Sequence, residues 1–212
     1  MTEDRVKLVL ASASPRRLAL LEQAGLVADL LSPADVDETP RRRESPRALS
    51  LRLATDKARA AAAAPLVQAL SGPVFVVAAD TVVAVGRRVV PKPQTVEEAT
   101  AALELLSGRS HHVFTSVCVI TPQGASRSRV VDTKVRFKRL TREDIECYLM
   151  SDEWRDKAGG YAIQGRADAF VRSLNGSYSG VVGLPLYEVL ALLQGNGFPV
   201  YFTLANTSRE RT

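Results

Sequence analysis

The stretch VKLVLASASPRR, residues 6–17, joins a short apolar run directly to the start of a helix. Ser14 is a favourable N-cap residue and Pro15 suits the first helical position, so the segment predicts a strand, a loop and a helix. Arg16 and Arg17 then lie at the positive end of the helix dipole, where each cation is disfavoured by about 0.3–1 kcal/mol. A bound anion reverses that balance, because free backbone N–H groups and two guanidinium groups point at one place. The segment therefore predicts a phosphate site, with a solvated basic turn as the simpler alternative.

The composition is that of a globular protein with one large domain or two lobes. The chain has 212 residues, of which 46% are hydrophobic and 24% are charged, so it can bury a substantial core. No apolar stretch approaches the roughly 18 residues that cross a bilayer, and the run over residues 6–11 is too short for a secretory signal. We expect a cytoplasmic protein without a membrane partner, with one domain over residues 1–204 and a frayed tail over residues 205–212.

The charge balance favours an anionic partner. The formal net charge is +5, and the excess is dispersed except at residues 41–43 and 127–139, which suits nucleotides at least as well as nucleic acid. An aromatic content of 6% is low for a groove that stacks single-stranded bases, so we do not expect nucleic acid as the partner. Cys118 and Cys147 lack the spacing of a zinc site and are expected to be ordinary core thiols.

The hydrophobic pattern predicts alternating strands and helices without an internal repeat. Asn175-Gly176 is the strongest short hairpin signal, and we expect strands on both sides of it. The expected helices after the first lie between Ser45 and Pro65, between Thr95 and Gly108, over residues 141–150 and over residues 186–193. The expected strands after the first cover residues 26–31, 74–85, 89–90, 113–120, 130–137, 169–174, 178–182 and 200–204.

Asp80 is the sharpest single candidate for chemistry, because it is the only charged residue in the apolar run over residues 74–85. A buried ionised carboxylate costs several kcal/mol unless a cation, a metal ion or hydrogen bonds compensate it. For a single aspartate, a structural ion pair explains such a position as well as function does. The surrounding chain favours function, because several cations accompany it.

Two lysines lie in contexts that orient their side chains. Lys57 shares a helical face with apolar residues, and Lys92 lies between two prolines that hold the chain extended. With Arg16, Asp80 and Glu38 they form the set of groups that metal-assisted phosphoryl chemistry uses. Taken singly, each lysine is more often a solvated side chain.

Several motifs in one order carry a family resemblance that runs nearly end to end. They are Ser12-Ala13-Ser14-Pro15-Arg16-Arg17, Val36-Asp37-Glu38, Lys57-Ala58-Arg59-Ala60, Ala79-Asp80-Thr81, Lys92-Pro93, Leu106-Ser107-Gly108-Arg109-Ser110-His111, residues 156–165 (DKAGGYAIQG) and Val182-Gly183-Leu184-Pro185. On these motifs the chain resembles the Maf family of nucleoside triphosphate pyrophosphatases, in the branch similar to dTTP/UTP pyrophosphatases. The resemblance implies an α/β fold with a mixed, curved central sheet flanked by helices and two lobes around a cleft, as in inosine-triphosphatase-like proteins.

The resemblance also implies a reaction and the residues that perform it. A nucleoside triphosphate is hydrolysed between its α and β phosphates to the monophosphate and pyrophosphate, with a divalent cation, Mg²⁺ or Mn²⁺, as cofactor. Asp80 is the implied acid/base, and Asp80 with Glu38 is the implied metal site. Gln164 can match the N3–H and O4 edge that uracil and thymine share, and with it Arg16 and Thr81 are implied to set base preference. The implied substrate-binding residues are Ser14, Arg16, Arg17, Lys57, Thr81, Lys92, Lys157 and Gln164.

Some residues depart from the family pattern or stay outside the expected catalytic set. Pro91 stands where many members have glycine, and Trp154 stands where proline is common. Trp154 lies in a loop expected near the base, so it bears on substrate preference more than on the reaction. His111 and His112 precede an expected strand after a glycine turn, and we interpret them as loop hydrogen-bonding groups.

Two alternatives to this function stay open at the level of the sequence. One is a pyrophosphatase for another noncanonical nucleotide. The other is a nucleotide-sensing or nucleic-acid-binding protein involved in cell division control, a role associated with the Maf name. Intact Asp80 and Glu38 argue against pure binding, because holding phosphates needs cations and gains little from two carboxylates. The sequence leaves open whether the protein forms a homodimer.

Overall fold

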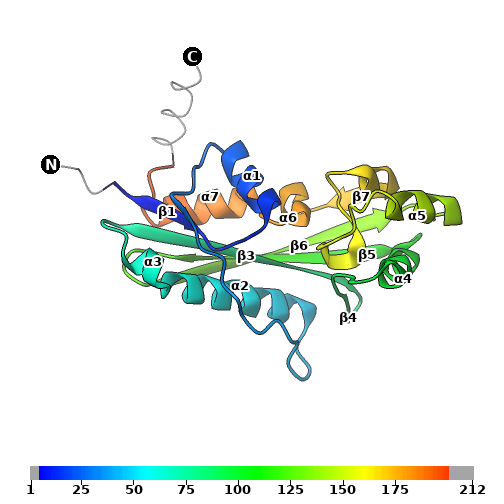
Figure 1. The fold of residues 1–212 in the computed structure, drawn as a ribbon, viewed down its shortest axis with the longest axis horizontal. Coiled ribbons are helices and arrows are strands. Elements are labelled where there is room, and N and C mark those ends of the chain that lie inside the picture. Colours follow the sequence, from blue (N-terminus) through cyan, green and yellow to red (C-terminus); the bar gives the residue numbers. More distant parts are fainter. Residues whose placement is uncertain (1–4, 201–212) are drawn as a thin grey trace, which may run out of the picture.

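The computed structural model describes residues 5–200, which form a long mixed sheet with helices on both faces (Figure 1). Within these residues the seven-stranded sheet has the order β2-β1-β3-β5-β6-β7, and β4 pairs with β3. The strands are β1 (Lys7–Leu10), β2 (Leu30–Leu31), β3 (Val74–Val85), β4 (Arg88–Val90), β5 (Ser110–Ile120), β6 (Ser126–Phe137) and β7 (Val171–Asn175). The helices are α1 (Pro15–Gln23), α2 (Pro46–Ala62), α3 (Pro65–Gln68), α4 (Val96–Leu106), α5 (Arg142–Leu149), α6 (Tyr178–Val182) and α7 (Leu186–Gly195), with 3₁₀ turns η1 (Ala158–Gly160) and η2 (Arg166–Phe170).

One edge of β3 is only partly covered by neighbouring strands. β1 runs parallel to β3 and its last register pair joins Leu10 to Val77. β4 runs antiparallel to β3 on the same edge and begins to pair only at Val83, opposite Val90. Residues 78–82 therefore lie on a stretch of β3 that neither β1 nor β4 covers. The opposite edge of β3 pairs with β5 throughout this stretch.

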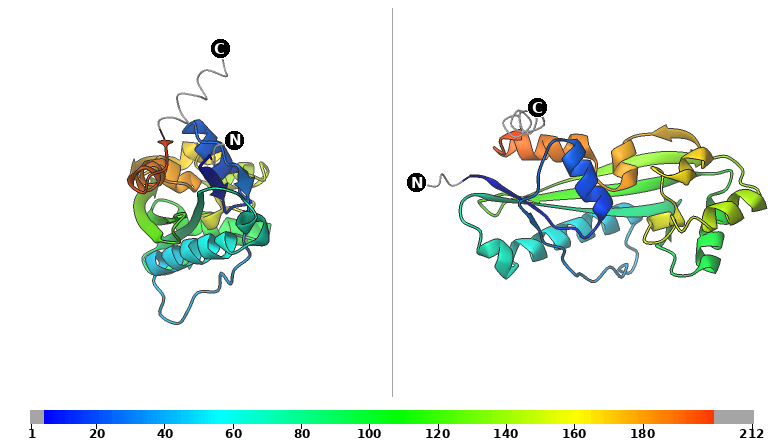
Figure 2. Two further views of the ribbon diagram at one scale, coloured as in Figure 1. Left: turned by 90° about the vertical axis from the view of Figure 1, so that its left-hand side faces the viewer. Right: turned by 45° about the horizontal axis from the view of Figure 1, so that its top comes forward.

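The helices form two layers around the sheet. Figures 1 and 2 show α2 along one face and α1, α6 and α7 along the other. Ala54 and Ala58 of α2 pack on Ala78, whereas Leu21 of α1 and Leu193 of α7 belong to a separate buried cluster on the other face. No helix within residues 5–200 is long and apolar enough to cross a membrane.

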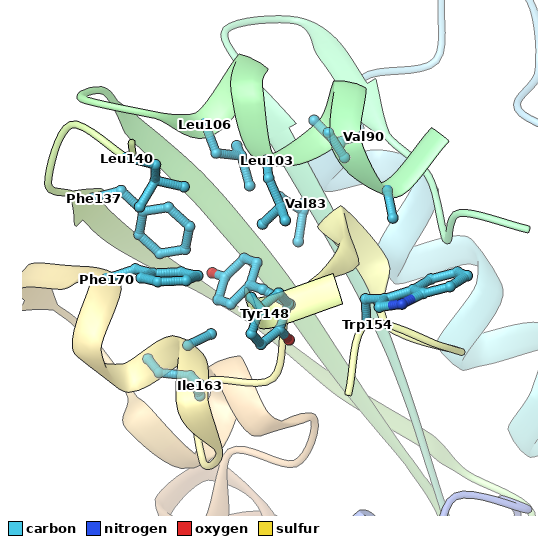
Figure 3. Close-up of a cluster of buried hydrophobic side chains, with 14 of the residues drawn as sticks. Val83, Val90, Leu103, Leu106, Phe137, Leu140, Tyr148, Trp154, Ile163 and Phe170 are labelled. Atoms are coloured by element: carbon cyan, nitrogen blue, oxygen red, sulfur yellow. The ribbon is translucent and has the colours of Figure 1, made fainter. Parts of the chain in front are cut away.

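A third core fills the far end of the sheet, under α4 and α5 (Figure 3). Phe137, Tyr148 and Phe170 stack edge to face there, with ring centroids 5.4–6.0 Å apart. Trp154 is 1% exposed in the same cluster, and its Nε1 donates to the Leu149 carbonyl at 3.2 Å. Separate cores at the two ends of one sheet agree with the expected two lobes, and the mixed α/β fold is confirmed.

The strand expected over residues 178–182 is wrong, because this segment is helix α6. Gly176 has φ of +132°, and a Cβ on it would lie 2.9 Å from the Thr133 Cα. The chain therefore presses onto β6 at this point instead of turning into a hairpin. Ser177 then caps the helix, since its side chain accepts from the Gly180 N–H at 2.9 Å.

Other expected boundaries also change. The strand expected over residues 26–31 is limited to β2, because the Asp29 carboxylate accepts from the Leu8 N–H at 2.8 Å and so replaces a backbone partner. The expected loop residues His111 and His112 lie inside β5. The strand expected over residues 200–204, beyond Val200, and the tail over residues 205–212 lie outside the described residues.

Candidate active site

The uncovered stretch of β3 opens into a cleft of about 510 Å³. The start of α1, the middle of α2, the chain after β4, the η1 segment and α6 complete its walls. Its lining includes every substrate-binding residue expected from the sequence, and Glu38 reaches it through two ion pairs. The expected residues that line the cleft are Ser14, Arg16, Arg17, Lys57, Asp80, Thr81, Lys92, Lys157 and Gln164.

The N-terminus of α1 faces this cleft, as the sequence predicts. Ser14 holds the N-cap position, but its side chain forms no capping hydrogen bond, and its N–H donates to Ser12 Oγ at 3.1 Å. Arg17 is anchored across the cleft, because its Nε donates to the Gly183 carbonyl at 2.8 Å. Burial lowers the pKa of Arg17, and the nearby Asp80 charge opposes that shift. Arg17 is thus a held, partly desolvated cation.

Two further cations meet on the η1 side of the cleft. Arg16 Nη2 donates to the Asp156 carbonyl at 3.3 Å, and Lys157 Nζ donates to the Arg155 carbonyl at 2.7 Å. Burial lowers the pKa of both side chains, and the Arg16 charge lowers the pKa of Lys157 further. Like charges that crowd in this way favour a polyanion between them.

The centre of the cleft is a lysine between two carboxylates. Lys57 Nζ donates to Asp80 Oδ1 at 2.7 Å and to Glu38 Oε1 at 2.5 Å. Asp80 is 6% exposed, so Lys57 supplies the compensating cation that its apolar strand requires. Lys92 Nζ lies 3.7 Å from Glu38 Oε2, which links the chain after β4 to the same group.

Electrostatics keep the outer carboxylate ionised. Partial burial acts to raise the pKa of Glu38, but the hydrogen bond from Lys57 and the charges of Lys57, Lys92 and Arg17 hold it below its ordinary value. Glu38 and Asp80 thus lie on either side of one ammonium group, that of Lys57.

These residues fit a divalent cation of the oxygen-preferring kind. Asp80 Oδ1 and Glu38 Oε1 both contact Lys57 Nζ, so a metal ion held by the pair would take the place of that ammonium group, and carboxylate oxygens are the preferred ligands of Mg²⁺ and Mn²⁺. Within residues 5–200 no group of three or more His, Cys, Asp or Glu side chains gathers into a complete metal site. The remaining ligands would be substrate oxygens and water, which is usual for Mg²⁺.

Thr81 points to the opposite face of β3 from Asp80, because successive side chains of a strand alternate. Its Oγ1 lies 3.5 Å from Arg17 Nη2 and 3.2 Å from Thr115 Oγ1. Thr115 in turn donates to the Gly180 carbonyl of α6 at 2.6 Å. The uncovered edge thus lets neighbouring residues of one strand serve the same cleft from two faces.

Beyond Thr81 the cleft becomes apolar. Val83 and Val113, on the same face, line it together with Tyr161 and the exposed Gln164. The sequence did not predict Val83, Val113 or Tyr161 as cleft residues. The alternation of side chains along β3 places Val83 on the same face as Thr81 and could have identified that residue. This end offers a flat ring and an amide, whereas the Lys57 end offers charges.

A buried histidine supports the apolar end. His111 is 0% exposed, and its Nε2 lies 2.8 Å from the Tyr161 hydroxyl. Burial lowers the pKa of His111 to about 4, so the ring is neutral at pH 7. The histidine therefore supports a residue of the cleft wall and does not itself line the cleft.

The segment with Gln164 is shaped by its glycines. Gly159 has φ of +73°, and a Cβ on it would lie 2.9 Å from Val83 Cγ1. A Cβ on Gly165 would lie 2.1 Å from Glu153 Oε2, which accepts from the Arg166 N–H at 2.8 Å. Trp154, a departure from the family pattern, lies in the core outside the cleft lining and anchors the start of this segment.

Comparison with known proteins gives a consistent result. A family model described as "Maf-like protein" matches residues 7–196. A dTTP/UTP pyrophosphatase of Mesorhizobium japonicum is 58% identical over 92% of this chain and 94% of its own. Proteins of the same name from Rhodopseudomonas palustris and Nitrobacter hamburgensis are 58% and 60% identical over 96% and 92% of this chain, and over 99% and 95% of their own. A solved dITP/XTP pyrophosphatase of Mycobacterium abscessus is 17% identical, with a TM-score of 0.40 over 90% of this chain and 94% of that one.

Proposed function

Because the chain belongs to the Maf family, we propose that it is a nucleoside triphosphate pyrophosphatase that hydrolyses dTTP and UTP. The observation that carries the proposal is the cleft at the β3 edge, where Asp80 and Glu38 share Lys57 beside the arginines of α1. The relatives that carry this activity in their names are 58–60% identical over most of the chain, which supports the substrate class.

The charged end of the cleft suits a triphosphate. Arg16, Arg17, Lys57, Lys92 and Lys157 come from four separate parts of the chain and line one space. Guanidinium and ammonium groups bind phosphate oxygens through charge-assisted hydrogen bonds, and partial burial strengthens these bonds. The cations also stabilise charge that develops on the leaving pyrophosphate.

Asp80 is the residue that we assign to proton transfer. Its carboxylate lies at the cleft wall with one oxygen bound to Lys57, which holds it in a defined orientation. A carboxylate placed in this way can orient a water molecule and accept its proton as the water attacks the α-phosphorus.

We assign Asp80 and Glu38 as ligands of Mg²⁺ or Mn²⁺, on the basis of their shared contact with one cationic group, Lys57 Nζ, whose place the metal ion would take. When bound, such an ion neutralises charge on the phosphate oxygens. Glu38 is exposed at the rim and Lys57 can move its ammonium group along a flexible stem, so both can adjust to a bound phosphate chain.

The apolar end of the cleft suits the nucleoside. Tyr161 and the two valines offer van der Waals contact, and the Gln164 amide offers one donor and one acceptor. Uracil and thymine present N3–H and O4 side by side, which a single amide can match. Cytosine has an unprotonated N3 and an exocyclic amine, so the same amide orientation leaves polar groups without partners.

The proposal includes action in the cytoplasm. Cys118 and Cys147 are both free thiols; Cys118 is buried as expected, whereas the core position expected for Cys147 is wrong, because Cys147 is exposed on α5. Exposed free thiols are typical of a reducing compartment.

The test is a panel of canonical and modified nucleoside triphosphates, each incubated with the purified protein and Mg²⁺, Mn²⁺ or EDTA. We expect monophosphate and pyrophosphate from UTP and dTTP, slower hydrolysis of CTP, and loss of hydrolysis with EDTA. Release of orthophosphate would refute the reaction type. Undiminished hydrolysis after thorough chelation would refute the metal assignment alone.

A further inference from the structure

The segment that carries Glu38 has no regular secondary structure. Residues 32–45 connect β2 to α2 and loop away from the sheet below α2 (Figure 1). Glu38 itself is exposed, with 48% of its side chain accessible. A carboxylate on such a segment loses conformational entropy when it is held for function, so something must hold the backbone around it.

One arginine of α2 contacts this segment at several places. Arg52 Nη1 donates to the Asp37 carbonyl at 3.2 Å, and its Nη2 donates to the Thr39 carbonyl at 3.0 Å. These two carbonyls flank Glu38. The guanidinium group also donates to both carboxylate oxygens of Glu44, through Nε at 2.8 Å and Nη2 at 3.0 Å.

The contact between Arg52 and the segment is partly buried, and the segment reaches it at two places. The side chains of Arg52 and Glu44 are 12% and 9% exposed. Glu44 Oε2 also accepts from the Arg41 N–H at 2.9 Å, so the later part of the segment returns to the same guanidinium group. Asp56, one helical turn after Arg52, lies 3.7 Å from Nη1. Arg52 thus donates four hydrogen bonds, and Asp56 adds an ion pair.

The position of Arg52 on α2 gives this contact a consequence for the cleft. Lys57, which donates a hydrogen bond to the Glu38 carboxylate, lies on the same helix. One rigid helix, α2, therefore holds both the backbone around Glu38, through Arg52, and the side chain of Glu38, through Lys57. Loss of the contact frees the segment without removing any group that lines the cleft.

We propose that Arg52 is a positioning residue for Glu38, and that its guanidinium group holds the carbonyls on both sides of Glu38 so that the carboxylate stays at the Asp80–Lys57 pair. The inference rests on the proposed function, because Glu38 is assigned there as a metal ligand. Lysine cannot replace Arg52 in this role, since an ammonium group lacks the planar fork that spans a carboxylate and two carbonyls.

The test combines two readouts on Arg52→Lys, with Arg59→Lys as the matched control. Arg59 is an exposed arginine of the same helix, so its replacement keeps the charge and exchanges the guanidinium group for an ammonium group in the same way. The first readout is kcat/KM for UTP with Mn²⁺ in wild type, Arg52→Lys, Glu38→Gln and the double variant. We expect Arg52→Lys to lower kcat/KM by about tenfold in the wild-type background and by less than about twofold in the Glu38→Gln background.

The second readout does not need activity. Arg41, Arg42 and Arg43 are exposed in the held segment, so trypsin reports its opening. We expect cleavage after residues 41–43, mapped by mass spectrometry, to be about tenfold faster in Arg52→Lys and unchanged in Arg59→Lys. If Arg52→Lys does not fold, Glu44→Gln serves instead, because it weakens the same contact from the other side, with a smaller change in the same direction.

The outcomes separate this inference from the proposed function. Equal cleavage rates in wild type and Arg52→Lys overturn the inference whatever the activity. Faster cleavage with the same loss of kcat/KM in both Glu38 backgrounds also overturns it, because Arg52 then acts independently of Glu38. A wild-type protein that does not hydrolyse UTP refutes the proposed function, and the proteolysis readout still decides whether Arg52 holds the segment.

Discussion

Replacement of Asp80 by asparagine gives the sharpest test of the catalytic assignment. The change keeps the shape of the side chain and removes its charge and its capacity to accept a proton. Positioned acid/base groups contribute about 10²–10⁴-fold to rate. We expect kcat for UTP to fall by about 100-fold or more, which corresponds to about 2.7 kcal/mol of activation free energy.

The structure also predicts a limited effect of this change on stability. Removal of one partner from an isolated buried ion pair costs about 3–5 kcal/mol, because the other charge stays unpaired. Lys57 is not left unpaired here, since Glu38 Oε1 still accepts its hydrogen bond at 2.5 Å. We therefore expect the free energy of unfolding to fall by about 1–2 kcal/mol, with the fold retained.

Three measurements decide this prediction. Steady-state kinetics with pyrophosphate detection give kcat, calorimetry with a nonhydrolysable UTP analogue gives Kd, and urea unfolding gives stability. Asp132→Asn is the matched control, because Asp132 is a half-exposed carboxylate on β6 that pairs with His112 at 2.7 Å, away from the cleft. Wild-type kcat in Asp80→Asn would refute the mechanism. A loss of stability as large as that of an isolated pair would show that Glu38 does not compensate Lys57.

Three other predictions concern the base preference of the cleft, the packing of Gly159 and the contact between Arg52 and Glu44. UTP and dTTP should have kcat/KM values at least about fivefold above that of CTP, because an unpaired buried polar group costs about 1–3 kcal/mol. Gln164→Glu should reduce this preference, and equal kcat/KM values for UTP and CTP in the wild type would contradict the prediction. Gly159→Ala should lower the free energy of unfolding by about 2–4 kcal/mol, through backbone strain and through the close contact with Val83. Gly124 has a similar φ of +77° with open space around it, so Gly124→Ala should lower the free energy of unfolding through strain alone, and equal denaturation midpoints for the two variants would refute the packing argument. The hydrogen bond from Arg52 lowers the pKa of Glu44 from 4.5 to about 2, so the contribution of Glu44 to stability is complete above pH 4.5 and is lost as the pH falls towards 2. Glu44→Gln should flatten that part of the stability–pH curve, and a curve parallel to that of the wild type would contradict the assignment.

The sequence predicted those parts of the fold that short-range patterns determine. The start of α1 follows from Ser14 and Pro15, and β3 follows from an unbroken apolar run. The expected strands over residues 113–120 and 130–137 are confirmed as parts of β5 and β6, which pair antiparallel across a short turn. In each case the residues that determine the element are close in sequence, so the local conformational preference and the tertiary structure favour the same conformation.

The remaining features depend on contacts between distant segments. The Asn175-Gly176 signal favours a hairpin locally, but the contact of Gly176 with Thr133 directs the chain across β6 and into α6. The site residues were predicted from the family motifs, and the structure brings them to one cleft. Neither the motifs nor the spacing predicted that Lys57 lies between two carboxylates, because that arrangement depends on where residues 32–45 return to α2.

The register of β3 explains why one strand can supply both ends of the cleft. Inside a continuous sheet, Asp80 and Thr81 would face separate layers, and a substrate could reach only one of them. Pairing with β1 ends at Val77 and pairing with β4 begins at Val83, so the edge between them is free for a ligand that reaches both faces. Asp80 then faces Lys57 of α2, whereas Thr81 faces Arg17 and, through Thr115, the Gly180 carbonyl of α6. Under the proposed function, this one strand contributes Asp80 to the part of the cleft that holds phosphate and Thr81 and Val83 to the part that holds the nucleoside.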